Sequence, residues 1–261
     1  MHCAYCFAKY DLTETKRLTH MESLDLIDRI ASAGTMKLTF AGGEPTLCPW
    51  LPDLISHAKN RGLTTMLVTN GTGLTDSFLT KMRGLLDWIG ISVNSLHVNL
   101  LKSIGAQCRN MIIDSDFYYR IVDEIKAYGY RLKVNTVVCS VNCNEDFTDF
   151  ITYANPERWK IFQMLPLMPG SQRFKVDLKE FRVFYERHAN KVTSCIDIIA
   201  EDNHIMTESY VMIDPIGRFY DNGKGRHSYS ASILDVGIEE AFRQIIVDDS
   251  KMLERNAVYN W

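Results

Sequence analysis

Hydrophobic and polar positions alternate along the chain in a way that predicts repeated strand and helix units. Five apolar runs are predicted as strands: MKLTFAGG, TTMLVTNG, DWIGISVNS, YRLKVNTVV and RWKIFQMLPL. Helical segments separate them, for example residues 53–60 and 117–128. Because strands that alternate with helices usually pair in parallel, the pattern predicts an α/β fold with crossover helices over a parallel sheet.

The first predicted helix has well-marked boundaries. Thr19 and Glu22 have the spacing of a capping box, apolar residues follow at helical intervals, and Gly34 ends the segment. A right-handed βα unit begins with a strand, yet this helix follows a loop, so we expect a first strand upstream of Met1. The predicted fold is a partial (βα)6 TIM-like barrel formed by residues 1–176.

The pattern changes beyond this point, and residues 177–261 are predicted as a C-terminal extension packed on the barrel. It begins with a helix, LKEFRVFYERHA, and continues into a hairpin around Pro215 and Gly217. An amphipathic segment, ILDVGIEEAFRQII, precedes the aromatic end VYNW.

Composition excludes several classes of protein. With 46% hydrophobic and 23% charged residues the chain can bury a core, and its net charge of −3 argues against wrapping a nucleic acid. No apolar run is long enough to span a bilayer, so we expect a cytoplasmic protein without a membrane partner. Seven scattered cysteines suit a reducing compartment, and Cys139, Cys143 and Cys195 are predicted to be buried.

Cys3 and Cys6 form a Cys-x-x-Cys pair that leaves three kinds of site open. The spacing suits zinc, a thioredoxin-type redox pair or one corner of an iron–sulfur cluster. His20 has no companion at zinc-ligand spacing, and the cysteines do not open a helix as a redox pair would.

Polar residues and glycines follow the predicted strands, which is where ligands bind in a parallel barrel. Gly42, Gly43 and Glu44 end one strand; Asn70 and Ser92 end the next two. A tight turn or a turn-capping Asn would explain each of these features taken singly.

Two predicted strands carry cations on one face. Lys133 and Asn135 lie two residues apart, as do Arg158 and Lys160, so each pair faces the same side, opposite apolar neighbours. Since the apolar face packs under helices, the cations should point into the barrel and bind an anion of several charges. The alternative is that they reach solvent or meet nearby acids. Lys37, which opens another strand, is a further candidate.

The phrases CAYCF and AGGEP, in this order and context, resemble the radical S-adenosylmethionine superfamily. Its signature has three cysteines, of which Cys3 and Cys6 match the second and third, and the first would lie two residues before Met1. The resemblance implies a [4Fe-4S] cluster held by these thiolates and S-adenosylmethionine as a second cofactor. The residues that match cofactor-binding positions are Phe7, Gly42, Gly43, Glu44, Asn70 and Ser92.

Further phrases, NPERWKIFQ, SYVMIDPIGRF, SILDVGIEEA and VYNW, are similar to the viperin family over essentially the whole chain. This implies removal of a hydrogen atom from C4′ of a ribonucleoside triphosphate by a 5′-deoxyadenosyl radical. Loss of the 3′-hydroxyl as water, with uptake of one electron and a proton, then gives a 3′-deoxy-3′,4′-didehydro nucleotide, a chain terminator with an antiphage role. Lys133, Arg158 and Lys160 match the triphosphate-binding positions and Asn135 accompanies them, while Lys37 remains a further candidate for the same site. Tyr210 matches a candidate proton donor, and the extension would close the nucleotide site.

Two departures and two alternatives accompany this resemblance. Ala106 stands where animal members carry a cofactor-binding arginine, which Arg109 could replace, and Ala41 stands in place of a serine.

The alternatives are a radical enzyme acting on another anionic substrate and a nucleotide-binding barrel without a cluster. The expected partners are CTP, UTP or GTP and an electron-donor protein, and the expected state is a monomer. The preferred base and the natural reductant do not follow from the sequence.

Overall fold

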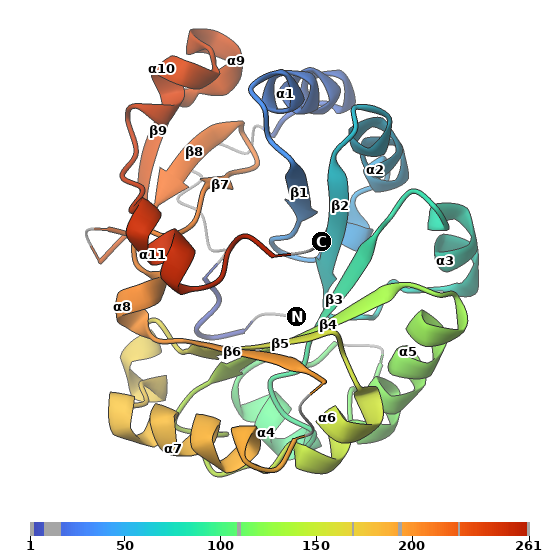
Figure 1. Cartoon of the computed structure of the whole chain (residues 1–261), viewed down its shortest axis with the longest axis vertical. Helices are drawn as coiled ribbons and strands as arrows, with labels where there is room; N and C mark the ends of the chain where they lie inside the picture. Colours follow the sequence, from blue (N-terminus) through green and yellow to red (C-terminus); the bar gives the residue numbers. More distant parts are fainter. Residues whose placement is uncertain are drawn as a thin grey trace.

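The computed structural model describes residues 3–7, 17–108, 111–168, 170–192, 195–223 and 225–259. Its centre is a parallel sheet whose strands pair in sequence order and curve around an interior, as Figure 1 shows. The predicted α/β partial barrel is therefore confirmed. The strands of this sheet are β1 (Lys37–Phe40), β2 (Thr64–Thr69), β3 (Trp88–Ser92), β4 (Arg131–Val138), β5 (Arg158–Gln163) and β6 (Asp197–Glu201).

Helices cover the outer face of this sheet (Figure 1). They are α1 (His20–Ser32), α2 (Leu51–Asn60), α3 (Asp76–Met82), α4 (Val98–Ser103), α5 (Ser115–Ala127), α6 (Thr148–Ala154) and α7 (Leu178–Ala189), with 3₁₀ turns η1 (Pro45–Leu47) and η2 (Ser171–Phe174). The predicted capping box of α1 is present: the Thr19 hydroxyl accepts from the Glu22 amide, and the Glu22 carboxylate accepts from the Thr19 amide.

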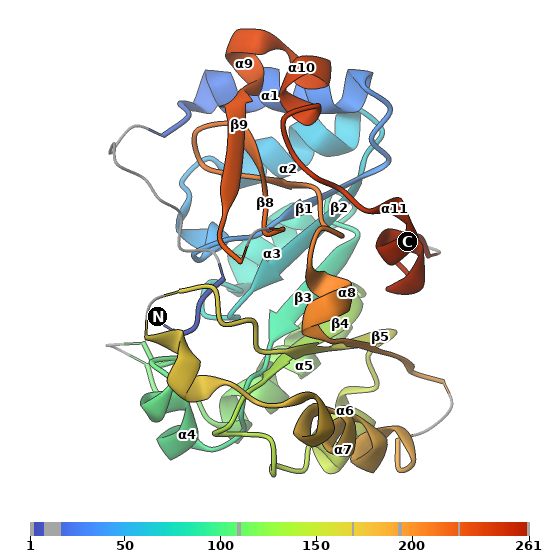
Figure 2. The same cartoon turned by 90° about the vertical axis from the view of Figure 1, so that its left-hand side faces the viewer.

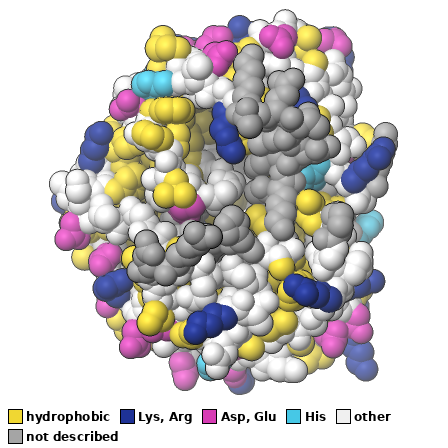
Figure 3. Space-filling view, turned by 180° about the vertical axis from the view of Figure 1, so that it is seen from behind, with side chains coloured by type: hydrophobic (Ala, Val, Ile, Leu, Met, Phe, Trp, Pro, Cys, Tyr) yellow, Lys and Arg dark blue, Asp and Glu magenta, His cyan; other side chains and the backbone are white. Residues whose placement is uncertain are grey.

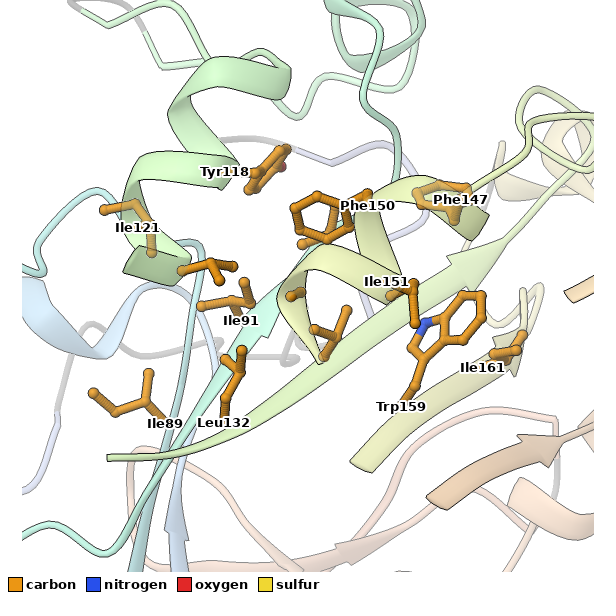
Figure 4. Packing of buried hydrophobic residues seen from close by; sticks show 14 of the residues in the cluster. Ile89, Ile91, Tyr118, Ile121, Leu132, Phe147, Phe150, Ile151, Trp159 and Ile161 are labelled. Atoms are coloured by element: carbon orange, nitrogen blue, oxygen red, sulfur yellow. The ribbon is translucent and has the colours of Figure 1, made fainter. Parts of the chain in front are cut away.

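The main core lies between the sheet and its outer helices. Figure 4 shows Leu132 of β4 and Trp159 and Ile161 of β5 beneath aromatic and aliphatic residues of α5 and α6. Trp159 is fully buried, and its indole N–H donates to the Thr136 hydroxyl at 3.0 Å. Because side chains alternate along a strand, burying these residues outward turns Lys133 of β4 toward the inner face.

The parallel sheet extends beyond the predicted boundary at residue 176. Helix α7 and strand β6 were assigned to the extension, but β6 pairs in parallel with β5 and supplies the sixth strand. The sequence prediction missed β6 because its apolar residues, 198–200, form only a short run between two acids. The strand expected upstream of Met1 lies outside the described residues.

The remaining C-terminal elements form a second, antiparallel sheet with short helices. They are α8 (Asn203–Met206), β7 (Met212–Ile213), β8 (Arg218–Asp221), β9 (Ser228–Ser232), α9 (Ile233–Val236), α10 (Ile238–Phe242) and α11 (Asp249–Glu254). The predicted hairpin is present, with Gly217 at a φ of 81° in its turn. The amphipathic segment after it is broken in two by Gly237, whose φ is 87°.

This C-terminal unit packs against α1 (Figure 2). Leu26 and Ile30 of α1 share a small buried cluster with Phe219 of β8 and Ile233 of α9. The Arg29 guanidinium reinforces the contact by donating to two carbonyl oxygens of α9, at 3.1 and 3.2 Å. In Figure 1 the second sheet accordingly lies across the interior from β2 and β3, between the β1 and β6 edges of the barrel.

On the face drawn in Figure 3, the described side chains do not concentrate charge of one sign. Figure 3 shows lysine, arginine, aspartate and glutamate side chains scattered over one face of the molecule. Within the described residues no helix has the length and apolar character needed to cross a membrane.

Candidate active site

The two N-terminal cysteines lie on one tight turn. The Cys6 amide donates to the Cys3 carbonyl at 3.1 Å, and the Ala4 amide donates to Ile104 at 3.0 Å, which ties the turn to the end of α4. Both thiols are partly exposed, and neither forms a disulfide. The described residues contain no group of three His, Cys, Asp or Glu side chains suited to a metal ion. This turn therefore offers two thiolate ligands side by side.

Aromatic side chains hold the cysteine turn in place from two sides. Tyr5 is buried against Phe174, with ring centroids 5.5 Å apart. Phe7 packs edge-on against His227, which directly precedes β9, at 5.0 Å and lies 6.4 Å from Tyr220 of β8. The sequence carried no signal for this contact, because the partners lie more than 200 residues apart. The predicted cofactor residue Phe7 thus also joins the two parts of the chain.

The loop after β1 has the backbone conformation that its glycines permit. Gly42 and Gly43 have φ values of 84° and 53°, in the left-handed region that side chains disfavour. Glu44 follows and anchors the loop to β2. Its Oε1 accepts from the Thr46 and Thr69 hydroxyls at 2.7 and 2.6 Å, and its Oε2 accepts from the Asn70 amide at 2.9 Å.

Glu44 was predicted as a hydrogen-bond acceptor for the cofactor, whereas in this structure both oxygens bind protein groups. Its visible role is to shape the loop whose backbone is exposed. Asn70, also predicted at the cofactor site, folds its own turn by accepting from the Thr72 amide at 2.9 Å. Ser92 ends β3 beside Asn135 of β4. The structure therefore brings these residues to the carboxyl ends of adjacent strands, with no contact that assigns a ligand to them.

Replacing Glu44 with glutamine should lower both stability and affinity for S-adenosylmethionine. The new amide group would face an N–H or O–H donor whichever way it turned, so at least one buried hydrogen bond would be lost. We expect the free energy of unfolding to fall by about 1–3 kcal/mol. Urea unfolding and calorimetric titration would measure the two effects, with exposed Glu239→Gln as the control. Unchanged stability would contradict the anchoring role.

The inner face of the sheet carries the predicted cations. Lys133, Asn135, Arg158 and Lys160 are each more than 90% buried. Among the described residues the Lys133 ammonium has no hydrogen-bond or ion-pair partner, and neither does the Asn135 Oδ1 atom. Burial, with repulsion from Lys160, holds the pKa of Lys133 well below its usual range. Buried polar groups without partners are unusual and indicate that a ligand supplies the missing contacts.

Two of the cations meet acids, as the alternative interpretation of these residues allowed. Arg158 lies 3.0 Å from Asp197, and Lys160 donates to Glu201. Asp197 and Glu201 lie on the inner face of β6, next to β5. Because β6 was not recognised as a strand, its acids could not be placed opposite the cations. The only available signal was their spacing of four residues, which puts both on one face of a strand.

Arg158 nevertheless keeps donors available. Its Nη2 donates to the Asn256 carbonyl at 2.8 Å, whereas Nε and Nη1 form no hydrogen bond within the described part of the chain. The guanidinium also stacks on Tyr259, with 3.9 Å from its central carbon to the ring centroid. The C-terminal segment therefore reaches the inner face of the barrel, as Figure 1 shows for the end of the chain.

Lys37 completes this group at the amino end of β1. Its ammonium donates to the Tyr259 hydroxyl at 2.5 Å and lies 5.6 Å from the Trp88 ring. Burial and the neighbouring Arg158 and Lys160 lower the pKa of Lys37 to about 7. Tyr259 was not among the predicted site residues, although the aromatic end of the chain had been noted.

Tyr210, the candidate proton donor, lies beside Lys160. Its hydroxyl donates to Glu201 and lies 3.3 Å from the Lys160 ammonium, while Arg255 covers its ring at 3.8 Å. Burial and the Glu201 carboxylate raise the pKa of Tyr210 well above its usual range. The phenol is therefore protonated at neutral pH.

The electrostatic balance of this region favours an anion. We use the name inner cluster for the cations Lys37, Lys133, Arg158, Lys160 and Arg255. Asp197 and Glu201 form ion pairs with Arg158 and Lys160, whereas Lys133 has no such partner in the described residues. A buried amine without a partner is costly, and a ligand with several negative charges would supply the missing contacts.

Two further expectations concern single residues. Ala106 is buried and its amide donates to Leu101, so it serves packing at the end of α4, while Arg109 lies outside the described residues. Cys139 and Cys143 are buried as predicted, but Cys195 is exposed, which contradicts the prediction for that residue. Cys195 immediately precedes the missed strand, where the apolar run had suggested burial.

Comparisons with known proteins identify the family of the chain. The family model of the radical SAM superfamily matches residues 1–154. An S-adenosylmethionine-dependent nucleotide dehydratase of Flammeovirga pacifica is 40% identical over the whole chain, which covers 92% of that protein. One of Lacinutrix mariniflava is 44% identical, and the chain spans 56% of its length. The solved structure of anSMEcpe with bound AdoMet shares the fold, with a TM-score of 0.68 at 16% identity, covering 97% of this chain and 78% of that one.

These matches extend over both the barrel and the C-terminal unit. The chain belongs to the radical SAM superfamily and, within it, to the family of S-adenosylmethionine-dependent nucleotide dehydratases.

Proposed function

We propose that this protein converts a ribonucleoside triphosphate into its 3′-deoxy-3′,4′-didehydro analogue, with S-adenosylmethionine and an iron–sulfur cluster as cofactors. The observation that carries the proposal is the inner cluster, in which the buried side chain of Lys133 has no partner in the described chain and lies near the buried cations Arg158 and Lys160. A triphosphate supplies the negative charges and acceptor oxygens that this cluster needs. As the resemblance implies, the product would terminate RNA chains and act against phage.

The cysteine turn fits the cluster as far as it is described. Cys3 and Cys6 present two thiols on one turn, which are ligands of the correct type, and the expected third cysteine lies outside the described residues. The bound cluster would supply the electron that cleaves S-adenosylmethionine and so starts hydrogen removal from the nucleotide. The exposed backbone of Gly42 and Gly43, held by Glu44, offers groups to the methionine moiety of that cofactor.

The residues of the inner cluster would bind and orient the nucleotide. Arg158 has unused N–H donors for phosphate oxygens, and Lys133 would exchange an unpaired state for a charge-assisted hydrogen bond. Asn135 lies nearer the carboxyl end of β4 than Lys133, so its unpaired Oδ1 atom is placed to accept from a ribose hydroxyl. These contacts would direct the ribose toward the carboxyl ends of the strands, where the cysteine turn lies.

Tyr210 would hold the proton that the last step consumes. After removal of the C4′ hydrogen atom, one electron and one proton are needed for the 3′-hydroxyl to leave as water and for the C3′–C4′ double bond to form. A phenol whose pKa is raised keeps its proton until a stronger base forms beside it. The electron would come from an external one-electron donor protein.

The decisive experiment is an anaerobic assay of the reconstituted full-length protein. Dithionite, S-adenosylmethionine and each of CTP, UTP and GTP are supplied, and both 5′-deoxyadenosine and a nucleotide lighter by one water are measured. We expect one triphosphate to increase 5′-deoxyadenosine formation and to yield the dehydrated product. If 5′-deoxyadenosine forms equally with and without nucleotide, and no dehydrated nucleotide appears, the proposal is wrong.

Nucleotide affinity should fall as the pH rises above about 8. Burial lowers the pKa of Lys160 to about 8, although Glu201 opposes the shift. Phosphate binding needs the protonated ammonium, so affinity is complete below this pKa and is lost as the pH rises through it. Since a required proton changes the Kd by up to tenfold per pH unit, we expect about a tenfold or greater rise in Kd between pH 7.5 and 9.5.

Titration calorimetry at several pH values would measure how the Kd for nucleotide depends on pH. No reductant is added, so that the protein does not react during the titration. Lys160→Arg is the matched control, because a guanidinium does not titrate in this range and should flatten the curve. A pH dependence that is identical in Lys160→Arg and the wild type would show that Lys160 is not the titrating group.

A further inference from the structure

Glu201 occupies a distinctive place between two groups of the candidate site. It ends β6, its side chain has no exposed surface, and one oxygen accepts from Lys160 while the other accepts from Tyr210. No resemblance or pattern had assigned this residue to the site. Lys160 also donates directly to the Tyr210 hydroxyl at 3.3 Å, so Glu201 is hydrogen-bonded to both members of a contacting pair.

The burial of a carboxylate among cations that are to bind an anion requires an explanation. Glu201 repels any phosphate bound at Lys160, so its presence weakens triphosphate binding relative to a neutral residue at this position. Asp197, the other acid on the inner face, is partly exposed, with 44% of its side-chain surface accessible, and contacts only Arg158 among the described ion-pair partners. Of these two acids, Glu201 is the one that contacts Tyr210 in the described residues.

We propose that Glu201 is a positioning residue, which orients the Tyr210 hydroxyl and keeps Lys160 charged, so that nucleotide binding and completion of the dehydration are coupled. This inference rests on the proposed function. Because the phenol donates its hydrogen to a fixed, buried oxygen, the hydroxyl cannot rotate freely. Its oxygen then stays beside the ammonium that would bind the phosphate, and its proton stays at a defined position.

The charges around Glu201 support both parts of this role. Lys160 approaches from β5, Arg255 from the segment after α11, and Tyr210 from the loop before β7. Lys133 of β4 and Arg158 of β5 lie in the same electrostatic environment. Burial lowers the pKa of Lys160, and the Glu201 carboxylate is the first influence that opposes it. Without that carboxylate the ammonium would lose its proton at a lower pH.

The test compares Glu201→Gln with Asp197→Asn in the reconstituted full-length protein. Both variants remove one carboxylate from the inner face and keep the shape of the side chain, but only the first alters the contact with Tyr210. The main measurement is the ratio of 5′-deoxyadenosine to dehydrated nucleotide. We expect this ratio to rise at least about fivefold in Glu201→Gln, because the started reaction would not be completed, and to stay within about twofold of wild type in Asp197→Asn.

Two further measurements separate positioning from a merely structural role. The Kd for nucleotide should increase with pH from a lower pH in Glu201→Gln than in the wild type, and Asp197→Asn should follow the wild type because arginine does not titrate. The double variant Glu201→Gln/Tyr210→Phe should have a ratio of 5′-deoxyadenosine to dehydrated nucleotide no higher than that of the more impaired single variant. This is the result expected for two residues that act as a unit.

The outcome can be judged even if the proposed function fails. If the wild type forms no dehydrated nucleotide, the carbon-13 signal of the Tyr210 ring, identified with Tyr210→Phe, still reports the hydrogen bond. A shift in Glu201→Gln and none in Asp197→Asn would support the positioning role by itself. Equal ratios in the two charge variants, or an unchanged Tyr210 signal in Glu201→Gln, would overturn the inference.

Discussion

Replacing Lys133 with methionine should stabilise the unliganded protein and, at the same time, weaken nucleotide binding about a hundredfold. The two effects have opposite signs because Lys133 is more than 90% buried and has no partner within the described chain. An apolar side chain of similar length removes the cost of burying an amine, which we expect to raise the free energy of unfolding by about 1–3 kcal/mol. The same change removes a charge-assisted contact to phosphate, worth about 2–4 kcal/mol.

Chemical denaturation and titration calorimetry would measure both quantities on the same preparation. Lys59→Met is a suitable control, because Lys59 pairs with Asp87 at 2.6 Å outside the inner cluster. That change should lower stability or leave it unchanged, and it should not affect nucleotide affinity. A destabilised Lys133→Met protein would show that burial of Lys133 is not costly. Wild-type nucleotide affinity in this variant would show that Lys133 is not part of the nucleotide site.

Replacing Cys6 with alanine should abolish cleavage of S-adenosylmethionine completely. Cys3 and Cys6 lie on one turn, and an iron–sulfur cluster held by three thiolates cannot retain its iron when one is lost. The turn itself should survive, because Tyr5 and Phe7 hold it through aromatic contacts that do not involve sulfur. Loss of activity without loss of fold is therefore the expected result.

Iron content, the visible absorbance of the reconstituted protein and the thermal unfolding temperature would be measured beside 5′-deoxyadenosine formation. The control is Cys195→Ala, because this thiol is exposed and precedes β6, away from the cysteine turn. It should retain wild-type iron content and activity. Normal iron content in Cys6→Ala would contradict the role of this thiol as a cluster ligand.

Much of the barrel could be predicted because its signals are local. Each of β2 to β5 carries a buried run and each intervening helix has an apolar stripe, so the periodicity alone places them. The first helix was predicted almost to the residue, since Thr19 and Glu22 cap it through their own side chains. Strand β6 was missed for the complementary reason: its inward residues are the acids Asp197 and Glu201, and its other side chains are only partly buried.

The candidate site was predictable where one strand contains several of its residues. Lys133 with Asn135, and Arg158 with Lys160, share a face because successive strand residues alternate. The contacts of Phe7, Tyr210 and Tyr259 with other parts of the site depend on chain segments that are distant in sequence. No local pattern specifies which distant side chain will approach, because this follows from how the C-terminal unit packs on α1.

The sequence by itself therefore determined the parallel sheet, the end of the strands that carries the loops, and the inward direction of the cations on β4 and β5. Only the tertiary structure decided how these cations are balanced. It placed Glu201 between Lys160 and Tyr210, and it left Lys133 without a partner in the described chain. The physical reason is that side-chain direction follows from the backbone period, whereas counter-ions are chosen by contacts between strands and segments that meet only in the folded chain.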